Sequence, residues 1–197
     1  KGRWEKCPDC QKRIKDEGLK NEQELQSYLV KRIEKFVNSR GKMIIGWDEI
    51  LEGGLADNAL VMSWRGEEGG IEAAEAGHEV VMSPNDICYF DHYQIDDPNE
   101  PFAFKGLTTI EDVYKWSIIP DELSEDKIHF IRGAQANVWT EYIPDEKQAE
   151  YMIFPRLCAL SEITWTKKEN LNYEDFMSRL TFHYKRLEYA GFNYKRP

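Results

Sequence analysis

Aromatic side chains stand beside charged side chains at four places along the sequence. The four groups are Trp47-Asp48-Glu49, Trp64-Arg65, Tyr89-Phe90-Asp91 and Trp139-Thr140-Glu141. Aromatic rings cover the apolar C–H faces of a sugar, and carboxylates accept strong hydrogen bonds from its hydroxyl groups. If the fold brings the four groups together, these residue types predict a pocket for a sugar-like ligand.

Each group follows a short apolar segment rich in β-branched residues, which predicts a buried strand. The expected strands cover residues 42–47, 59–64, 79–83 and 128–136. Apolar residues at helical spacing predict helices at 21–40, 67–76, 145–163 and 171–190, the third interrupted near Pro155. We expect residues 1–20 to be turn-like and residues 84–120 to form a long polar loop.

The ends of two expected helices carry recognisable signals. Asn21 is the expected N-cap of the first helix, with Glu24 three residues later as a capping-box partner. Gly41 and Gly191 follow the first and the last helix as stop residues.

Apolar strands that alternate with helices indicate an α/β fold with a parallel sheet covered on both faces. The loops after the strands are longer than the returning loops, as in a β/α barrel, which carries its site on the loops after the strands. The four aromatic residues would then converge, joined by Asp91 and Glu141. A doubly wound sheet is the alternative, but its G-x-G-x-x-G phosphate turn is absent from the sequence.

Composition excludes several classes of partner. The chain has 197 residues, a hydrophobic fraction of 41% and a net charge of −10, which argues against nucleic acid as a partner. No apolar run approaches the length of about 18 residues that a membrane helix needs. Cys7 and Cys10 form a single C-x-x-C with no second pair, so we expect a turn before a helix and neither a metal site nor a redox site.

Five motifs resemble a known family. They are Gly46-Trp-Asp-Glu-Ile50, Val61-Met-Ser-Trp-Arg-Gly66, Gly77-His-Glu-Val-Val-Met-Ser-Pro84, Cys88-Tyr-Phe-Asp-His-Tyr-Gln94 and Gly133-Ala-Gln-Ala-Asn-Val-Trp-Thr-Glu141. In this order and at these distances they look like family 20 glycoside hydrolases, the β-N-acetylhexosaminidases. The resemblance runs from about Trp4 to the end of the chain.

The resemblance implies a fold and an activity. It implies the C-terminal half, about strands 5–8, of a TIM-type (β/α)8 barrel, with residues 1–197 as a single partial catalytic domain: a half barrel plus a C-terminal helix. It also implies hydrolysis of terminal β-linked N-acetylglucosamine or N-acetylgalactosamine with retention, in which the acetamido oxygen of the sugar attacks the anomeric carbon. No metal or organic cofactor is implied.

The resemblance also assigns roles to single residues. Tyr89 would donate its hydroxyl to the acetamido oxygen. The pocket walls would be Trp47, Trp64 and Trp139, and the far hydroxyls of the sugar would bind Asp91 and Glu141. The family's catalytic Asp-Glu dyad lies in a His-x-Gly-Gly-Asp-Glu motif that this sequence lacks, and the Arg with which the family holds the sugar is also missing. We expect the dyad upstream of Lys1 in a longer parent, and the isolated chain to be inactive.

Three alternatives stay open at this point. The adjacent pair Asp48-Glu49 could be catalytic, but it follows the wrong strand and Trp47 matches the pocket tryptophan, so support of the loop is the other interpretation. The chain could be a non-catalytic sugar-binding module, or a structural domain whose strand-end aromatics only pack. A half barrel would expose strand edges and apolar surface, so we expect the isolated chain to self-associate.

Overall fold

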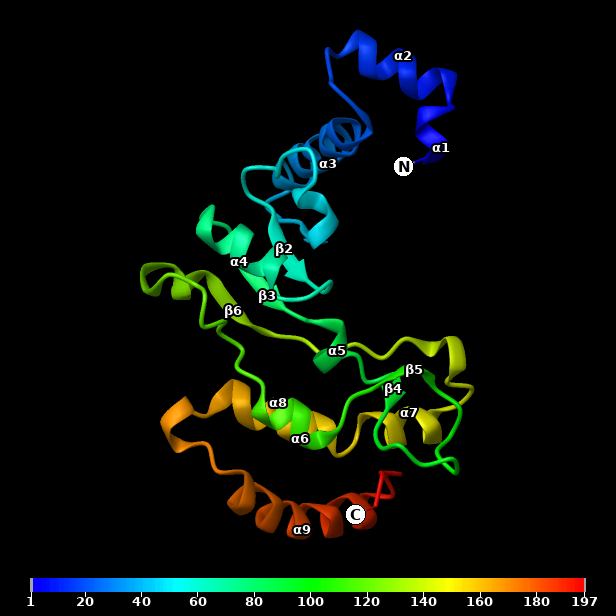
Figure 1. The fold of residues 1–197 in the computed structure, drawn as a ribbon, viewed down its shortest axis with the longest axis vertical. Coiled ribbons are helices and arrows are strands. Elements are labelled where there is room, and N and C mark those ends of the chain that lie inside the picture. The colour runs from blue at the N-terminus through cyan, green and yellow to red at the C-terminus, as the bar shows by residue number, and fades with distance from the viewer. Residues whose placement is uncertain (1, 197) are drawn as a thin grey trace. The chain divides into compact units, whose positions relative to one another are not determined.

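The computed structural model describes residues 2–196, which divide into two compact units (Figure 1). Unit 1 contains the described residues up to Val81 together with Asp121–Arg132, and unit 2 contains Met82–Pro120 and the described residues from Gly133 onward. Each unit has its own helices. That the chain forms a single partial catalytic domain remains a prediction.

One four-stranded sheet holds the predicted strands in the order β1-β2-β3-β6. Its strands are β1 (Ile45–Trp47), β2 (Leu60–Ser63), β3 (Val80–Met82) and β6 (Ile131–Ala134). The strands β1 and β2 pair in parallel, with Trp47 opposite Met62. Val61, Val80 and Met82 are fully buried, as expected of a sheet covered on both faces. The parallel α/β architecture is therefore confirmed, although residues 125–130 form the short helix η2 (Glu125–Phe130) and not the start of a strand.

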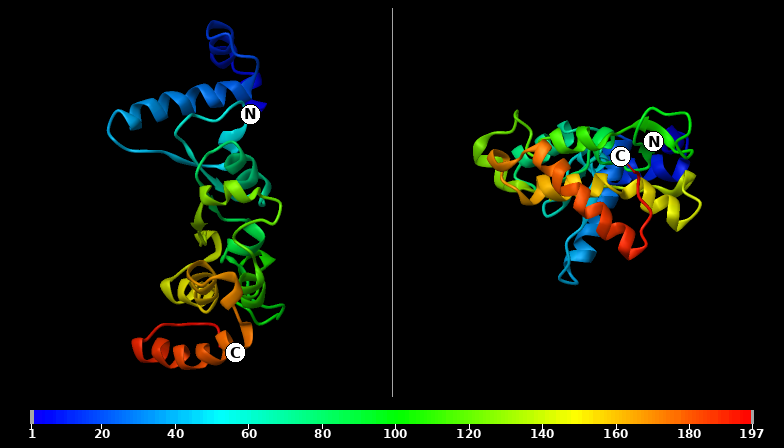
Figure 2. Two further views of the ribbon diagram at one scale, coloured as in Figure 1. Left: turned by 90° about the vertical axis from the view of Figure 1, so that its left-hand side faces the viewer. Right: turned by 90° about the horizontal axis from the view of Figure 1, so that it is seen from below.

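Unit 1 begins with helices where turns were expected. These are α1 (Gly2–Glu5) and α2 (Pro8–Asp16), followed by α3 (Glu22–Asn38), η1 (Asp48–Leu51) and α4 (Glu68–Glu75). Cys7 caps α2, Pro8 occupies its first turn, and the i,i+4 ion pair of Lys12 with Asp16 supports it. The prediction of a turn-like segment was wrong because these local signals outweigh the high charge of the segment. Figure 2 shows α3 along its full length, next to α2.

The ends of α3 agree with the sequence, but its buried face does not. Asn21 Oδ1 accepts a 3.0 Å hydrogen bond from the backbone N–H of Glu24, whereas the Glu24 carboxylate accepts from Lys20 instead of closing the capping box. The buried residues of α3 are Ser27 and Glu34. The apolar stripe of the helix is exposed, with exposed fractions of 48% for Leu29, 48% for Ile33 and 60% for Phe36.

Unit 2 contains several short elements in the stretch expected to be a polar loop. These are α5 (Asn85–Cys88), β4 (His92–Tyr93), β5 (Phe104–Leu107) and α6 (Ile110–Lys115). The strands β4 and β5 pair in parallel, and Thr109 and Asp112 form a complete capping box at the start of α6. The prediction of a loop over residues 84–120 was wrong, because elements of two to six residues are too short to show a periodicity.

The rest of unit 2 is helical. It comprises η3 (Thr140–Tyr142), α7 (Glu146–Ile153), α8 (Arg156–Trp165), η4 (Lys168–Asn170) and α9 (Tyr173–Ala190). The third expected helix is therefore two helices, separated at the cis peptide bond between Phe154 and Pro155. None of the helices within residues 2–196 is long and apolar enough to cross a membrane.

The core of unit 2 lies where α6, α8 and α9 meet, and α9 runs alongside α8 (Figures 1 and 2). Its members include Val113, Leu160 and Phe176. The predicted apolar side of α9 is confirmed, since Leu180, Tyr184 and Leu187 are buried. Gly191 ends the helix with a left-handed φ of 79°, as its position predicts.

Candidate functional site

In unit 1, the two strand-end tryptophans of the sequence prediction lie together. Trp47 ends β1 and Trp64 follows β2, which pairs with β1 in register. Their ring centroids are 6.5 Å apart and the rings cross at 78°. The Trp64 indole N–H donates a 3.0 Å hydrogen bond to Glu49 Oε2, which fixes the orientation of the ring.

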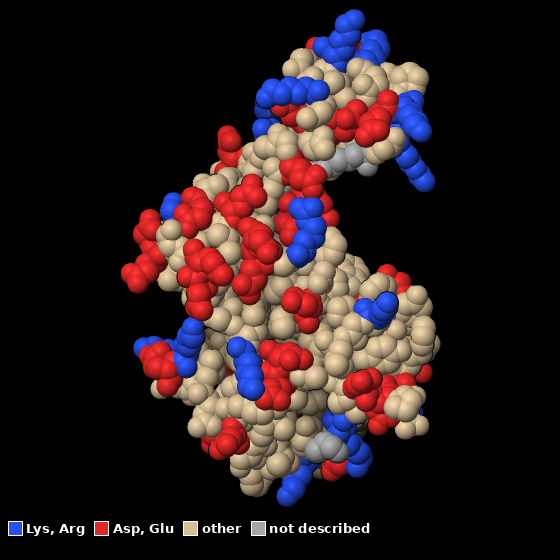
Figure 3. All heavy atoms as spheres, in the orientation of Figure 1, with Lys and Arg blue, Asp and Glu red and all other residues tan. Residues whose placement is uncertain are grey.

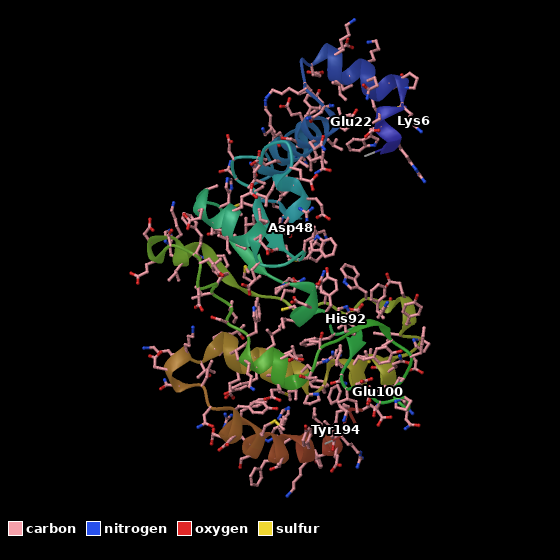
Figure 4. The ribbon with its side chains drawn as sticks, in the orientation of Figure 1. Lys6, Glu22, Asp48, His92, Glu100 and Tyr194 are labelled. Carbon is pink, nitrogen blue, oxygen red and sulfur yellow. The ribbon has the colours of Figure 1, made fainter. Side chains whose placement is uncertain are left out.

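The carboxylate of Asp48 organises the loop that carries Trp64. Asp48 is buried, and its Oδ2 accepts hydrogen bonds from the backbone N–H groups of Trp64 at 3.0 Å and Arg65 at 3.1 Å. Its Oδ1 accepts from Arg65 Nε at 2.5 Å. Figure 4 labels Asp48 directly after β1, at the start of η1. Since both oxygens are occupied by the loop after β2, the contacts favour support of the loop over catalysis for the Asp48-Glu49 pair.

An acidic surface adjoins this loop. Glu52, Glu68 and Glu72 line a cavity of about 280 Å³ together with Arg65, and Figure 3 shows acidic side chains gathered over α4 and its surroundings.

In unit 2, the segment after β6 pairs with the segment after α5. Asn137 forms a parallel bridge with Tyr89, donates its N–H to Cys88 O at 2.8 Å and accepts from Phe90 N–H at 2.8 Å. The Asn137 side chain donates to Ser83 Oγ at 2.6 Å, which ties the same segment to the end of β3. This pairing brings the ring of Tyr89 to 6.1 Å from that of Trp139, at an interplanar angle of 56°.

Asp91 lies buried beside this aromatic pair. Its side chain is 3% exposed, and within residues 2–196 its Oδ1 has no hydrogen-bond partner. Burial raises the pKa of the Asp91 carboxyl, against the opposing effect of a hydrogen bond from the Trp139 backbone N–H. The nearby negative charge of Glu141, an exposed residue on η3, raises this pKa slightly further. A buried carboxylate oxygen without a partner is destabilising.

The His92 ring lies next to that of Tyr89, with ring centroids 6.1 Å apart. The His92 ring stacks on Phe104 and its Nδ1 is 3.3 Å from Thr108 Oγ1. Burial lowers the pKa of His92, so the ring is neutral at physiological pH. The ring also packs tightly on the backbone, because a Cβ at Gly106 would lie 2.6 Å from it. Figure 4 labels His92 on the chain between α5 and β5.

Sequence reasoning missed Phe104 and Arg156. Phe104 lies in the stretch expected to be a loop, and Arg156 is a buried cation that no pattern of the sequence indicated. Cys7 is the N-cap of α2, as the turn-before-helix interpretation requires. Within residues 2–196, no group of three or more His, Cys, Asp or Glu side chains is arranged to hold a metal ion.

The family model described as "Glycosyl hydrolase family 20, catalytic domain" matches residues 1–168 of the chain. The chain belongs to glycosyl hydrolase family 20. The family resemblance of the five sequence motifs is thereby confirmed. The chain is 49% identical to a β-hexosaminidase of Porphyromonas gingivalis over its whole length, but this alignment spans 26% of that protein. It is 31% identical to a β-hexosaminidase of Vibrio furnissii over 81% of the chain and 27% of that protein.

A solved family 20 structure has the same fold over nearly the whole chain. The GH20 exo-β-N-acetylglucosaminidase of Vibrio harveyi, in complex with N-acetylglucosamine, aligns with a TM-score of 0.90 and 32% identity over 98% of this chain and 31% of that one. Family 20 catalytic domains are TIM barrels, so the parallel strands described above are part of a (β/α)8 barrel. The chain spans about a quarter to a third of the length of these family 20 relatives.

Proposed function

We propose that this family 20 chain is part of a β-N-acetylhexosaminidase and supplies residues that bind the terminal sugar. The reaction is hydrolysis of terminal β-linked N-acetylglucosamine or N-acetylgalactosamine, with an N-acetylhexosamine-containing glycan as substrate. The names of the relatives support the activity: two are β-hexosaminidases and one is an exo-β-N-acetylglucosaminidase bound to N-acetylglucosamine.

The observation that carries the proposal is the group formed by Tyr89, Asp91 and Trp139. It combines an aromatic pair 6.1 Å apart with a buried carboxylate whose Oδ1 lacks a partner within the described chain. Packing alone would favour an apolar residue at position 91, since burying a carboxylate with one unsatisfied oxygen is costly. A sugar hydroxyl that donates to Asp91 would recover the lost hydrogen bond, while the rings cover the sugar's apolar face.

The proposed roles follow from these contacts and from the family. Tyr89 donates its hydroxyl to the acetamido oxygen and holds it for attack on the anomeric carbon, and Trp139 covers the sugar ring. Asp91 and Glu141 accept hydrogen bonds from the far hydroxyls. We extend the wall role to Trp47 and Trp64, which are held 6.5 Å apart by the loops after β1 and β2.

The proposed reaction needs two further groups that we do not assign within these 197 residues. As the acetamido oxygen bonds to the anomeric carbon, the bond to the leaving oxygen breaks and an acid protonates that oxygen. A second carboxylate orients the acetamido group. The His-x-Gly-Gly-Asp-Glu motif that carries both in the family does not occur in this sequence, so we propose that a part of the protein outside this chain supplies them.

The test is release of a chromogenic aglycone from an aryl β-N-acetylglucosaminide by the full-length protein and by this chain, side by side. We expect activity in the full-length protein only. Activity of the isolated chain would contradict the proposal and make Asp48 and Glu49 the first candidates for the catalytic pair. Absence of activity in both, with retained N-acetylglucosamine binding, would favour a sugar-binding module.

A further inference from the structure

Arg156 is a fully buried cation at the start of α8. It forms five hydrogen bonds within the described chain, and all of them end on backbone carbonyls. Its Nη2 donates to Phe90 O at 2.6 Å and to Met152 O at 2.6 Å, and its Nε also donates to Met152 O at 3.2 Å. Its Nη1 donates to His92 O and to Thr108 O, both at 3.0 Å.

Two of these carbonyls belong to the residues on either side of Asp91. The guanidinium therefore holds the backbone immediately before and immediately after the buried carboxylate. It also lies over the Phe90 ring, with its central carbon 4.8 Å from the ring centroid. Residue 91 consequently sits in a segment in which the peptide group between residues 90 and 91 and the one between residues 92 and 93 are both held by one rigid, planar side chain.

The same guanidinium joins the two strands of the small sheet at the site. Nη1 divides its hydrogen bonds between His92 in β4 and Thr108 just after β5, and the His92 ring in turn faces Thr108 Oγ1 and Tyr89. Arg156 thus contacts the backbone around Asp91. It also contacts the backbone of His92, whose ring lies next to Tyr89.

Helix stability alone does not account for this arrangement. Burying a cation without a carboxylate in contact is expensive, and what compensates the cost here is the set of backbone carbonyls from several segments to which Arg156 donates. Burial lowers the pKa of Arg156 to about 9, partly offset by the more distant charges of Asp91 and Glu100, so the group remains a cation at neutral pH. A planar cation with five donors is suited to organising carbonyls that several segments present at one point.

We propose that Arg156 is a positioning residue of the sugar site, which holds Asp91 in the orientation that accepts the sugar's hydroxyl. This inference rests on the proposed function, and it adds a residue that touches no substrate. Arg156→Lys keeps the charge but offers one donor point that cannot reach four carbonyls at once. The segment around Asp91 would then shift, and displacement of a binding group by about 1 Å can lower a rate by up to about 100-fold.

The experiment is a double-mutant cycle in the full-length protein, with kcat/KM on an aryl β-N-acetylglucosaminide as the readout. The variants are Arg156→Lys, Asp91→Asn and the two combined. Arg179→Lys is the matched control, because Arg179 is an exposed arginine of α9 paired with Glu162 and Asp175. We expect Arg156→Lys to lower kcat/KM by about 10- to 100-fold in the wild-type background. In the Asp91→Asn background the same substitution should lower kcat/KM by less than about 3-fold. The control Arg179→Lys should keep kcat/KM within about 2-fold of the wild-type value.

A purely structural role for Arg156 would lower kcat/KM by the same factor in both backgrounds, and that result overturns the inference while leaving the proposed function intact. A wild-type protein without hydrolytic activity overturns the proposed function and the inference with it. If Arg156→Lys does not fold, Phe90→Leu replaces it in the same cycle, since it removes the ring beneath the guanidinium and keeps the arginine. Equal losses for Phe90→Leu with and without Asp91 would again overturn the inference.

Discussion

The buried carboxylate of Asp48 accepts a 3.0 Å hydrogen bond from the backbone N–H of Trp64, sixteen residues later in the chain. The bond joins the loop after β1 to the loop after β2, and the neighbouring Glu49 accepts the indole N–H of the same tryptophan. An adjacent Asp-Glu pair that resembles a catalytic dyad in sequence therefore serves, in its observed contacts, to hold Trp64 in place.

Asp48→Asn is expected to lower the free energy of unfolding by about 1–3 kcal/mol. The amide keeps one acceptor oxygen, so it cannot satisfy both the backbone N–H groups and Arg65 Nε, and it removes a charge-assisted bond. Urea denaturation of the chain measures the loss. Glu52→Gln is the control, because Glu52 also pairs with Arg65, at 2.9 Å, but lies partly exposed. An exposed pair of this kind contributes less than about 1 kcal/mol, and an equal loss in both variants would contradict the role given to Asp48.

Tyr89→Phe in the full-length protein is expected to lower kcat/KM by about 10²- to 10³-fold, because the proposed donor to the acetamido oxygen is lost. The ring stays, so the packing against Trp139 is retained and stability should change little. Steady-state kinetics on an aryl β-N-acetylglucosaminide give the comparison. Tyr173→Phe on α9 is the matched control: Tyr173 packs on Tyr114 and Phe176 in the core of unit 2. If both variants keep full activity, Tyr89 does not hold the acetamido group.

Asp91→Asn is expected to raise the stability of the chain at neutral pH. Burial raises the pKa of Asp91 in the folded state above its ordinary value of 3.8, so between the two values the folded chain binds more protons than the unfolded chain. Stability contributed by this group is therefore lost as pH rises through the folded-state pKa. The amide stays neutral at all these values and escapes the loss.

The measurement for Asp91→Asn is urea denaturation at pH 7.5 and near pH 4, with the exposed Asp57→Asn as control. The stability gained by the Asp91 variant should be larger at the higher pH and shrink at the lower one. A gain that does not depend on pH, or a loss at pH 7.5, would show that the ionised carboxylate is not disfavoured by the fold. Stabilisation together with lost sugar binding would mark Asp91 as a residue retained for function at the expense of stability.

The strands and the long helices were predictable because the spacing of apolar residues within each of them can be read from the local sequence. Buried strands of apolar residues followed by aromatic side chains gave β1, β2, β3 and β6, and the apolar side of α9 gave Leu180 and Leu187 as core. The same reasoning failed for residues 84–120, where β4 has two residues and its partner β5 follows eleven residues later. Elements this short are stabilised by pairing with distant segments and have no period to detect.

The support of the site was beyond sequence reasoning for a related reason. Three of the four carbonyls to which Arg156 donates are 48 to 66 residues away, and a carbonyl is offered by every residue type. Asp48, by contrast, could be placed near the correct loop, because a charged residue directly after an apolar strand is conspicuous. The backbone N–H groups of Trp64 and Arg65 that Asp48 binds were nevertheless not indicated by the sequence, for the same reason as the carbonyls around Arg156.

The isolated chain is expected to self-associate through the exposed apolar stripe of α3. Leu29, Ile33 and Phe36 present adjacent apolar side chains on one side of the helix, and exposed apolar patches of this kind drive association in water. Ile33→Glu should therefore weaken association without loss of helix, since Glu has at least the helix propensity of Ile.

Lys35→Gln is the control, because it changes the net charge by one unit in the same direction on the same helix. Sedimentation velocity over a concentration series measures the weight-average mass of each chain. The mass of the wild-type chain and of the Lys35→Gln variant should rise with concentration. The Ile33→Glu variant should stay monomeric at the same concentrations. A wild-type chain that remains monomeric throughout, or three chains that associate equally, would show that the α3 stripe is not an association surface.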